Sequence, residues 1–290
     1  MKRIIFDCDN TLGIDKCDVD DGLALLYLTL NEECELEAIT TTYGNNAVDI
    51  VTENTKKMIK EFDLHNIEII KGGKNSNDFN NGASVFLAKY CSEHEGEISI
   101  LATGSLTNIY GAYRFDEEFF DNIKELVIMG GITEELEFPN KNMGELNLSS
   151  DFRASYEVIN ACSEDKLSVI TGNSCLDLLF DHNEFCIENM SSRAIQIYEC
   201  VKNWTAYISD EYGTDGFYNW DVIAAIYLLH KEFFDTKKSS VDIDINDLVN
   251  GFLKIANQGS CETDIKNIQL PKMKCKKEIK NEFFTIWERL

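Results

Sequence analysis

The feature that most constrains the fold of this 290-residue chain is a repeated alternation of short apolar runs with longer amphipathic segments. Most apolar runs end in glycine, and the segments between them, such as Val48–Phe62 and Thr107–Tyr113, have helical periodicity. Strands that alternate with helices predict an α/β fold with a mostly parallel, doubly wound, Rossmann-like sheet. The runs expected to form strands are Arg3–Phe6, Leu36–Thr42, Ile67–Ile70, Ile98–Ala102, Glu125–Met129 and Leu167–Ile170.

The rest of the chain is consistent with one domain over residues 1–290. The composition is 44% hydrophobic and 11% aromatic, which is enough for a sizeable core, and no low-complexity linker or repeat is visible. Glu134–Met143 is expected to be a charged loop, and Ser191–Trp220 a helix followed by a loop rich in Tyr, Gly and Asp. Loops of this kind over an α/β sheet usually carry specificity. Gln258–Lys277 is locally basic and contains no recognisable motif.

Charge and cysteine usage limit the partners and the compartment. A net charge of -24 argues against binding to nucleic acid or to an anionic membrane. No apolar run approaches the ~20 residues that span a bilayer, and the chain enters its first strand without a signal-peptide stretch. The ten cysteines are scattered singly, with no Cys-x-x-Cys pair. We therefore expect free thiols in a reducing cytoplasm.

Four carboxylates cluster near the N-terminus. Asp7 and Asp9 follow the first predicted strand, and Asp20 and Asp21 open the predicted helix Gly22–Leu30. Ligands of open α/β sheets bind in the crevice at the carboxyl ends of the strands. Carboxylates this close repel one another unless a cation or shared protons compensate, so a hard divalent metal with oxygen ligands is predicted. Helix capping is the alternative, and it explains one or two of the four acids.

Other polar residues lie at similar positions. Asn45 follows a strand end, where it can bond sugar hydroxyls or simply complete a turn. The backbone carbonyl at the strand end before Thr103-Gly104 is free to ligate a cation. Glu145 and Asn147 are expected on one side of a short extended segment suited to a diol. Asp221 heads an apolar helix, either as an N-cap or as a metal ligand.

Taken in order, these segments resemble the inosine-uridine-type nucleoside hydrolases. Order and spacing match from about residue 3 to residue 235, although no single motif is diagnostic. The matching segments are Asp7-Cys8-Asp9, Asp20-Asp21-Gly22-Leu23-Ala24, Gly44-Asn45, Thr103-Gly104-Ser105-Leu106-Thr107-Asn108, Met129-Gly130-Gly131, Glu145-Leu146-Asn147, Leu176-Asp177 and Asp221.

The resemblance implies a calcium-dependent N-ribohydrolase that converts ribonucleosides to free base and ribose, as in purine and pyrimidine salvage. It implies that Asp20 bonds the 2′ hydroxyl and that Asp9 is the base that deprotonates water. Members of the family are commonly homodimers or homotetramers. The implied Ca²⁺ ligands are Asp9, Asp21, the carbonyl of Thr103, and Asp221. The implied substrate-binding residues are Asp20, Asn45, Asn140 (or Asn142), Glu145, Asn147, Trp220 and Asp221.

The chemistry is coherent with these residues. Breaking an N-glycosidic bond develops positive charge on the ribose, as in other oxocarbenium-like glycosyl transfers. Neighbouring carboxylates favour that charge, and a bound metal lowers the pKa of water. Asp9, beside the predicted metal, is a natural general base.

Two departures from the family pattern stand out. Ten residues, Asn10–Val19, intervene between Asp9 and Asp20, where about three are usual, and a role for Asp18 in the site is left open. Several members place a His before the late Asp to protonate the leaving base, whereas this chain has Trp220. Trp220 can stack on a base, or it can simply pack in the core. None of His65, His94, His182 and His230 matches a catalytic position, and other aromatic candidates are Tyr207, Tyr212 and Tyr218.

Two alternatives come from other functional classes. The opening run Ile4–Leu12 also resembles the first motif of haloacid-dehalogenase-type phosphatases, with Asp7 as nucleophile, Asp9 as acid and base, and magnesium as cofactor. That hypothesis leaves the acids at 20, 21 and 221 unexplained. A non-catalytic nucleoside- or ribose-binding protein on the same scaffold is the other alternative, because the leaving-group His is absent.

Overall fold

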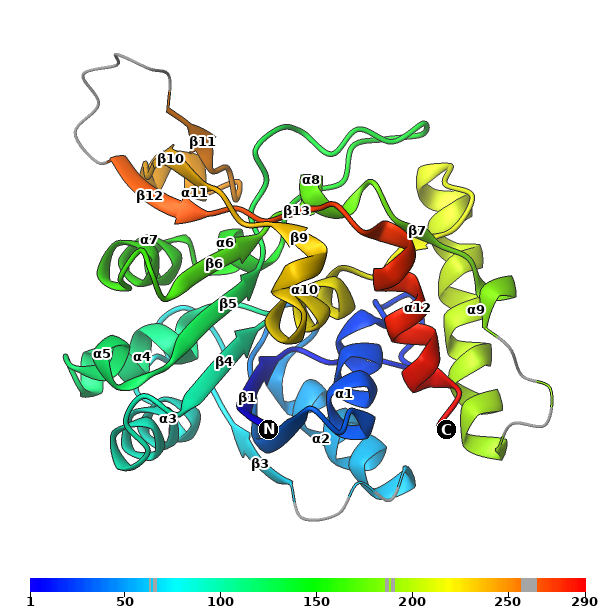
Figure 1. The fold of residues 1–290 in the computed structure, drawn as a ribbon, viewed down its shortest axis with the longest axis horizontal. Coiled ribbons are helices and arrows are strands. Elements are labelled where there is room, and N and C mark those ends of the chain that lie inside the picture. Colours follow the sequence, from blue (N-terminus) through cyan, green and yellow to red (C-terminus); the bar gives the residue numbers. More distant parts are fainter. Residues whose placement is uncertain (63, 65–66, 186–187, 189–190, 257–264) are drawn as a thin grey trace.

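The computed structural model describes residues 1–62, 64, 67–185, 188, 191–256 and 265–290. In this part of the chain the main sheet has nine strands, in the order β11-β10-β12-β6-β5-β4-β1-β2-β3 (Figure 1). The strands from β12 to β3 pair in parallel, and β10 and β11 add antiparallel pairs. The prediction of a mostly parallel α/β sheet is confirmed. The nine strands are β1 (Lys2–Cys8), β2 (Cys34–Thr41), β3 (Glu68–Lys71), β4 (Ile98–Ala102), β5 (Glu125–Met129), β6 (Leu167–Ile170), β10 (Lys238–Asp242), β11 (Lys254–Ile255) and β12 (Ile265–Gln269).

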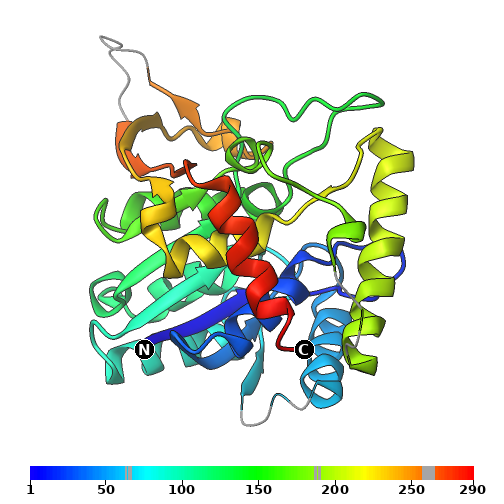
Figure 2. The same cartoon turned by 45° about the vertical axis from the view of Figure 1, so that its right-hand side comes forward.

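Helices cover both faces of this sheet. Figures 1 and 2 show α3, α4 and α7 on one face and α1, α10 and α12 on the other. Among the described residues no helix is both long and apolar enough to cross a membrane. The helices are α1 (Asp20–Leu30), α2 (Val48–Glu61), α3 (Gly82–Glu93), α4 (Thr107–Phe115), α5 (Phe119–Asn122), α6 (Asn147–Ser150), α7 (Phe152–Ala161), α8 (Gly172–Cys175), α9 (Ser192–Tyr212), α10 (Trp220–Leu229), α11 (Ile245–Leu248) and α12 (Lys276–Trp287). Shorter elements are η1 (His182–Glu184), η2 (Lys231–Phe233), and the strand pairs β7 (Leu179–Phe180) with β8 (Phe217–Tyr218) and β9 (Phe234–Asp235) with β13 (Lys272–Met273).

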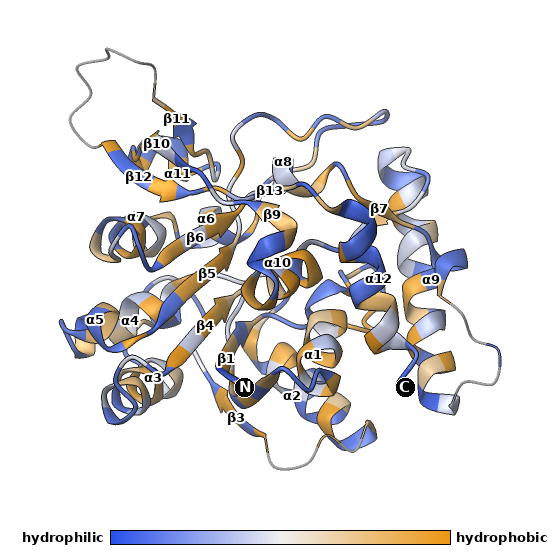
Figure 3. Cartoon of the chain, viewed as in Figure 1, coloured by the Kyte–Doolittle hydropathy of each residue, from blue (hydrophilic) through white to orange (hydrophobic). Residues whose placement is uncertain are grey.

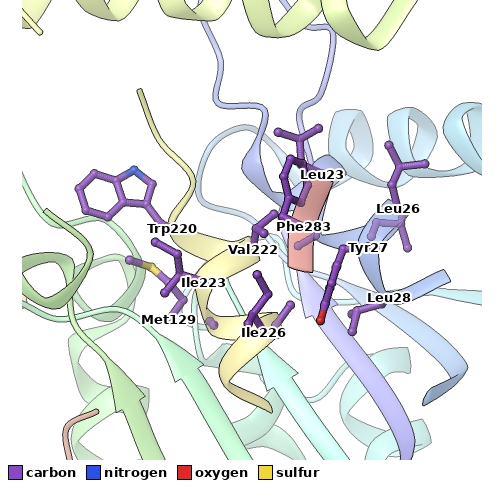
Figure 4. Close-up of a cluster of buried hydrophobic side chains, with 14 of the residues drawn as sticks. Leu23, Leu26, Tyr27, Leu28, Met129, Trp220, Val222, Ile223, Ile226 and Phe283 are labelled. Carbon is purple, nitrogen blue, oxygen red and sulfur yellow. The ribbon is translucent and has the colours of Figure 1, made fainter. Parts of the chain in front are cut away.

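The first strand is apolar throughout because helices cover it on both sides. Successive side chains of a strand point to opposite faces, so Ile4 and Phe6 enter one core cluster and Ile5 enters the other. Figure 3 shows the central strands as mostly hydrophobic and the outer helices as amphipathic. Figure 4 shows side chains of α1 and α10 packed together on the first of these faces. Each fully buried side chain of this size contributes about 1.5–3 kcal/mol to stability.

The strand order reverses at β1, which pairs with β2 on one side and with β4 on the other. A crevice forms outside the carboxyl ends of the strands at such a switch point. The segments that follow β1, β2 and β4 carry the polar residues singled out in the sequence. The fold therefore brings those residues to one edge of the sheet.

The structure corrects one sequence prediction and shows elements in a segment for which none was predicted. The segment around Glu145–Asn147 is not extended, because Asn147 begins helix α6. The Gln258–Lys277 segment contains β12 and β13 and leads into α12, while its residues 258–264 lie outside the described part. Strand β12 was missed because its only buried side chain is Ile268, so polar residues mask the period-two pattern.

Candidate active site

Three buried carboxylates meet where two helices begin. Asp20 and Asp21 form the first turn of α1, and Asp221 lies in the first turn of α10. Each offers a carboxylate oxygen within 4.8 Å of the others, and none is more than 3% exposed. Asp20 accepts hydrogen bonds from the backbone N–H groups of Asp21 (3.1 Å) and Asp221 (3.4 Å). The N-cap residues of the two helices are Val19 and Asn219, so none of the three acids is the cap residue.

Asp9 joins this cluster through Asn45. The Asn45 backbone N–H donates to Asp9 Oδ2 at 2.5 Å, and its side-chain amide donates to Asp9 Oδ1 (3.2 Å) and Asp21 Oδ2 (3.4 Å). The Thr103 hydroxyl donates to Asp21 Oδ1 at 2.7 Å. Gly44 is needed for this approach, since a Cβ there would lie 2.0 Å from Asp9 Oδ2. Side chains that follow β1, β2 and β4 thus converge at the carboxyl ends of the strands.

The electrostatics of the cluster are unfavourable without a cation. Burial, followed by the charge of Asp21, raises the pKa of Asp9 well above its usual value. Burial and the charge of Asp20 raise the pKa of Asp21 to about 7 and that of Asp221 well above its usual value. No ion pair to a basic side chain reaches these acids in the part of the chain that the structure describes. An all-oxygen, uncompensated donor set fits a hard divalent ion, so the buried cluster could hold a metal.

A cavity of about 350 Å³ opens beside the cluster. A pocket of this size is large enough for a small organic ligand. Asp9 and Asp21 are not part of its lining, but they contact the lining residues Asn45 and Thr103. The predicted site residues that line it are Asp20, Asn45, Thr103, Glu145, Asn147, Trp220 and Asp221.

Glu145 and Asn147 are held in place by the backbone. The Glu145 carboxylate accepts from the N–H groups of Gly131 (3.0 Å), Leu148 (2.7 Å) and Ser149 (2.8 Å). The Asn147 amide donates to the carbonyl of Met129 at 3.0 Å. Both side chains therefore present fixed polar groups on one wall of the cavity.

Aromatic side chains form another part of the wall. Trp220 is 9% exposed, and its ring centroid lies 5.0 Å from that of Tyr218. Figure 4 shows the indole on the side of Met129, away from Val222 and Ile226 of the same helix. Tyr207 and Tyr212, two of the aromatic candidates, also line the cavity, whereas Tyr218 does not line it and packs against Trp220.

Trp204 was not among the residues predicted from the sequence. It lines the cavity, and its ring centroid lies 5.6 Å from that of Tyr207. The available signal was the spacing of Trp204, Tyr207, Ile208 and Tyr212, which places all four on adjoining faces of helix α9.

Asn140, predicted to bind substrate, does not line the cavity. Asn140 is exposed at the tip of a hairpin closed by the Leu136–Met143 bridge, and its amide donates to the carbonyl of Asp210 at the end of α9. Asn142 pairs with Glu135 instead. A role for either amide in substrate binding stays a prediction.

The inserted segment Asn10–Val19 reaches the cavity through Lys16 and Asp18. Asp18 Oδ1 accepts from the N–H groups of Val19 (2.7 Å) and Asp20 (3.3 Å), and burial raises its pKa to about 7. None of the described histidines lines the cavity, and His65 lies outside the described residues. Asp177 pairs with Lys276 and also lies away from the cavity.

Asp7, the nucleophile of the phosphatase alternative, is fully buried and does not line the cavity. Its Oδ1 accepts from Thr40 at 2.5 Å and from Asn108 at 2.8 Å. These bonds link β1, β2 and α4, which gives Asp7 a structural position behind the site.

Comparisons with known proteins point to one family. The model of the family "Inosine-uridine preferring nucleoside hydrolase" matches residues 4–284. The chain is 24% identical over 287 residues to "Probable uridine nucleosidase 2" of Oryza sativa subsp. japonica, covering 86% of this chain and 80% of that protein. It is 28% identical over 188 residues to the "Inosine-uridine preferring nucleoside hydrolase" of Crithidia fasciculata, covering 55% and 57% of the two chains.

Solved structures show the same fold. The plant nucleoside hydrolase PpNRh1 superposes with a TM-score of 0.85 at 18% identity, covering 99% of this chain and 98% of that one. The purine-preferring ribonucleoside hydrolase from Gardnerella vaginalis gives a TM-score of 0.83 at 18% identity, with the same coverage.

Proposed function

The chain belongs to the inosine-uridine preferring nucleoside hydrolase family and is an N-glycosyl hydrolase, and we propose that it cleaves ribonucleosides to free base and ribose in a calcium-dependent reaction. The observation that carries the proposal is the buried, uncompensated cluster of Asp20, Asp21 and Asp221 on the wall of a ligand-sized cavity. Family membership favours this assignment over the phosphatase and over a non-catalytic binding protein on the same scaffold.

The proposed Ca²⁺ ligands are Asp9, Asp21, Asp221 and the carbonyl of Thr103, with Asp20 adjoining them. Carboxylate and carbonyl oxygens without Cys or His favour calcium over zinc. When bound, the ion would supply positive charge that orients ribose hydroxyls and lowers the pKa of a nearby water.

Side chains of the chain itself accept the proton, bind the ribose and contact the base. Asp9 accepts a proton from the attacking water, and Asp20 binds the 2′ hydroxyl. Asn45, Glu145 and Asn147 bind the other ribose hydroxyls, because their polar groups line the same cavity. The carboxylates stabilise the positive charge that develops on the ribose as the N-glycosidic bond breaks. Trp220 stacks on the base.

A nucleoside panel tests this assignment. Ribonucleosides should release free ribose, chelator should stop the release, and calcium should restore it. Deoxyribonucleosides should react far more slowly, by roughly 10⁴-fold, because a site built for the 2′ hydroxyl is left with unpaired polar groups. Equal rates on both sugars would reject the proposed role of Asp20. Phosphate-ester hydrolysis that disappears in Asp7→Asn would instead support the phosphatase alternative.

We also propose a cytoplasmic role in purine and pyrimidine salvage and a homodimeric or homotetrameric state. The compartment is supported by the eight cysteines of the described part, all of which are free. The net charge of -24 agrees with a small-molecule substrate in place of nucleic acid. Light scattering on the purified protein would measure the oligomeric state.

A further inference from the structure

Lys16 is an unusual residue on the wall of the cavity. It is the only basic side chain among the described residues that line it, whereas the same lining holds Asp18, Asp20, Glu145 and Asp221. Lys16 is exposed, and in the described part of the chain no hydrogen bond or ion pair involves its ammonium. A cation with no protein partner is available to a ligand in the cavity.

The backbone of Lys16 is also unusual. Its φ is 59°, the one positive φ of a non-glycine residue among the residues described. A side chain with a Cβ disfavours this left-handed conformation, which persists only where the surroundings hold it and is concentrated at functional sites. A glycine at this position would avoid the strain, but the chain has a lysine there.

The inserted loop is held firmly on both sides of Lys16. The Asn54 amide donates to the carbonyls of Asn10 (3.3 Å) and Leu12 (3.2 Å). The Thr11 hydroxyl donates to the carbonyl of Asp18 at 2.9 Å, which closes the loop. These bonds position Lys16 at the cavity rather than leaving it on a free loop.

The location of the loop indicates which part of a substrate Lys16 meets; this step rests on the proposed function. Lys16 lies four residues before Asp20, the proposed partner of the 2′ hydroxyl, and C2′ adjoins the carbon that bears the base. The loop also lies against α9 one helical turn before Trp204, since a Cβ on Gly13 would lie 3.4 Å from Cys200 Sγ, and these two residues line a separate hollow. Helix α9 supplies the aromatic wall through Trp204 and Tyr207. Glu145 and Asn147 come from a different segment, after β5.

We propose that Lys16 contacts the leaving base and stabilises the negative charge that the base acquires as it departs. The N-glycosidic bond breaks, and its electron pair stays on the base nitrogen. The oxygen of water bonds to C1′, one water proton passes to Asp9, and the base takes a proton from solvent. The ammonium keeps its protons and acts as a fixed cation beside the leaving group. Lys16 thereby assists the leaving base at a cavity that none of the described histidines lines.

The test compares leaving groups. Lys16→Met should lower kcat on ribonucleosides by roughly 10–100-fold, the value of a lost charge-assisted hydrogen bond. It should barely change kcat on p-nitrophenyl riboside, whose leaving group departs without assistance. Lys16→Arg should recover much of the nucleoside rate. The control is Lys124→Met, which removes an exposed lysine next to the amino end of β5 and should not change either rate.

Folding is controlled by Lys16→Gly, which suits the positive φ. This variant should melt no lower than the wild type and should show the same selective loss on nucleosides. Equal losses on both substrates, or no loss on either, would overturn the proposal for Lys16. A loss seen only with nucleoside 5′-monophosphates would also overturn it, because Lys16 would then face the other end of the sugar. Absence of ribose release by the calcium-loaded wild type would instead reject the proposed function.

Discussion

Buried carboxylates lie both at the edge of the sheet formed by the amino ends of the strands and at the edge formed by their carboxyl ends. Only those at the amino edge are paired with basic side chains among the described residues. At the amino ends of the strands, Glu125 is 7% exposed and bonds Lys2 (2.8 Å), Lys231 (2.5 Å) and the Ser99 hydroxyl (2.9 Å). The two lysines hold its pKa below the usual value. At the carboxyl ends, the aspartate cluster has no cationic partner among the described residues, and its pKa values are raised.

Helix α10 spans the two edges. It begins beside Asp221, where its dipole favours negative charge, and it ends near Lys2, which donates to the carbonyl of Leu228 at 2.5 Å. His230 follows its last turn and contacts Glu282 at 3.2 Å. At the amino edge this protein neutralises a buried acid with its own lysines. At the carboxyl edge the acids have no such partner among the described residues, and the cluster could hold a metal ion.

The largest expected effect is the loss of activity in Asp21→Ala. Asp21 is bonded to both Asn45 and Thr103, so its removal should abolish Ca²⁺ binding and ribose release together. Elemental analysis and a ribose assay measure the two quantities on one sample. Glu125→Gln is the matched control, and it should keep both the ion and the rate. Stoichiometric zinc in the wild type would contradict the assignment of calcium.

Next in size are two stability changes of opposite sign, measured in chelator by urea unfolding. Glu125→Gln should lower the free energy of unfolding by about 1–3 kcal/mol, because two lysines lose a charged partner. Asp20→Asn should raise it by about 1 kcal/mol, because it relieves repulsion between buried carboxylates. If Asp20→Asn is destabilising in chelator, the cluster is already compensated and the contrast between the edges is wrong.

Substitution of Trp220 tests whether this residue of the carboxyl edge stacks on the base or only packs in the core. Trp220→Phe should keep much of the rate, whereas Trp220→Ala should raise KM and lower kcat/KM. The loss in kcat/KM should correspond to ~1–3 kcal/mol of transition-state stabilisation, the typical cost of losing a base-stacking aromatic. Steady-state kinetics on ribonucleosides give both values. If Trp220→Ala changes only the melting temperature, the residue serves packing alone, and Tyr207 becomes the next candidate.

The smallest effect concerns pH at the amino edge. Glu282, with Glu33 and Glu232 nearby, raises the pKa of His230 above its ordinary 6.5. A raised folded-state pKa means that the contribution to stability is complete below pH 6.5 and is lost as pH rises through the higher value. The wild type should therefore lose up to about 1 kcal/mol more than His230→Gln between mildly acidic and mildly alkaline pH. Parallel pH profiles of the two proteins would contradict this.

Much of the site could be predicted because its residues follow strand ends or open helices. Asp9 and Thr103 come directly after β1 and β4, and Asn45 lies four residues beyond the end of the neighbouring β2. Parallel strands place their carboxyl ends at one edge of the sheet. Trp204 and Lys16 could not be found in this way. Trp204 looks like any aromatic residue of an amphipathic helix, and Lys16 lies in an insertion without periodicity.

The sequence by itself determined the parallel α/β core and the carboxylate cluster, since both depend on local patterns: apolar runs of strand length and acids at fixed offsets from them. Only the tertiary structure decided which face of α9 meets the cavity, that Asn140 turns to α9 instead, and that the inserted loop brings Lys16 to the site. These contacts join segments far apart in the chain. Packing and loop closure set them, and neither leaves a repeating signal in the sequence.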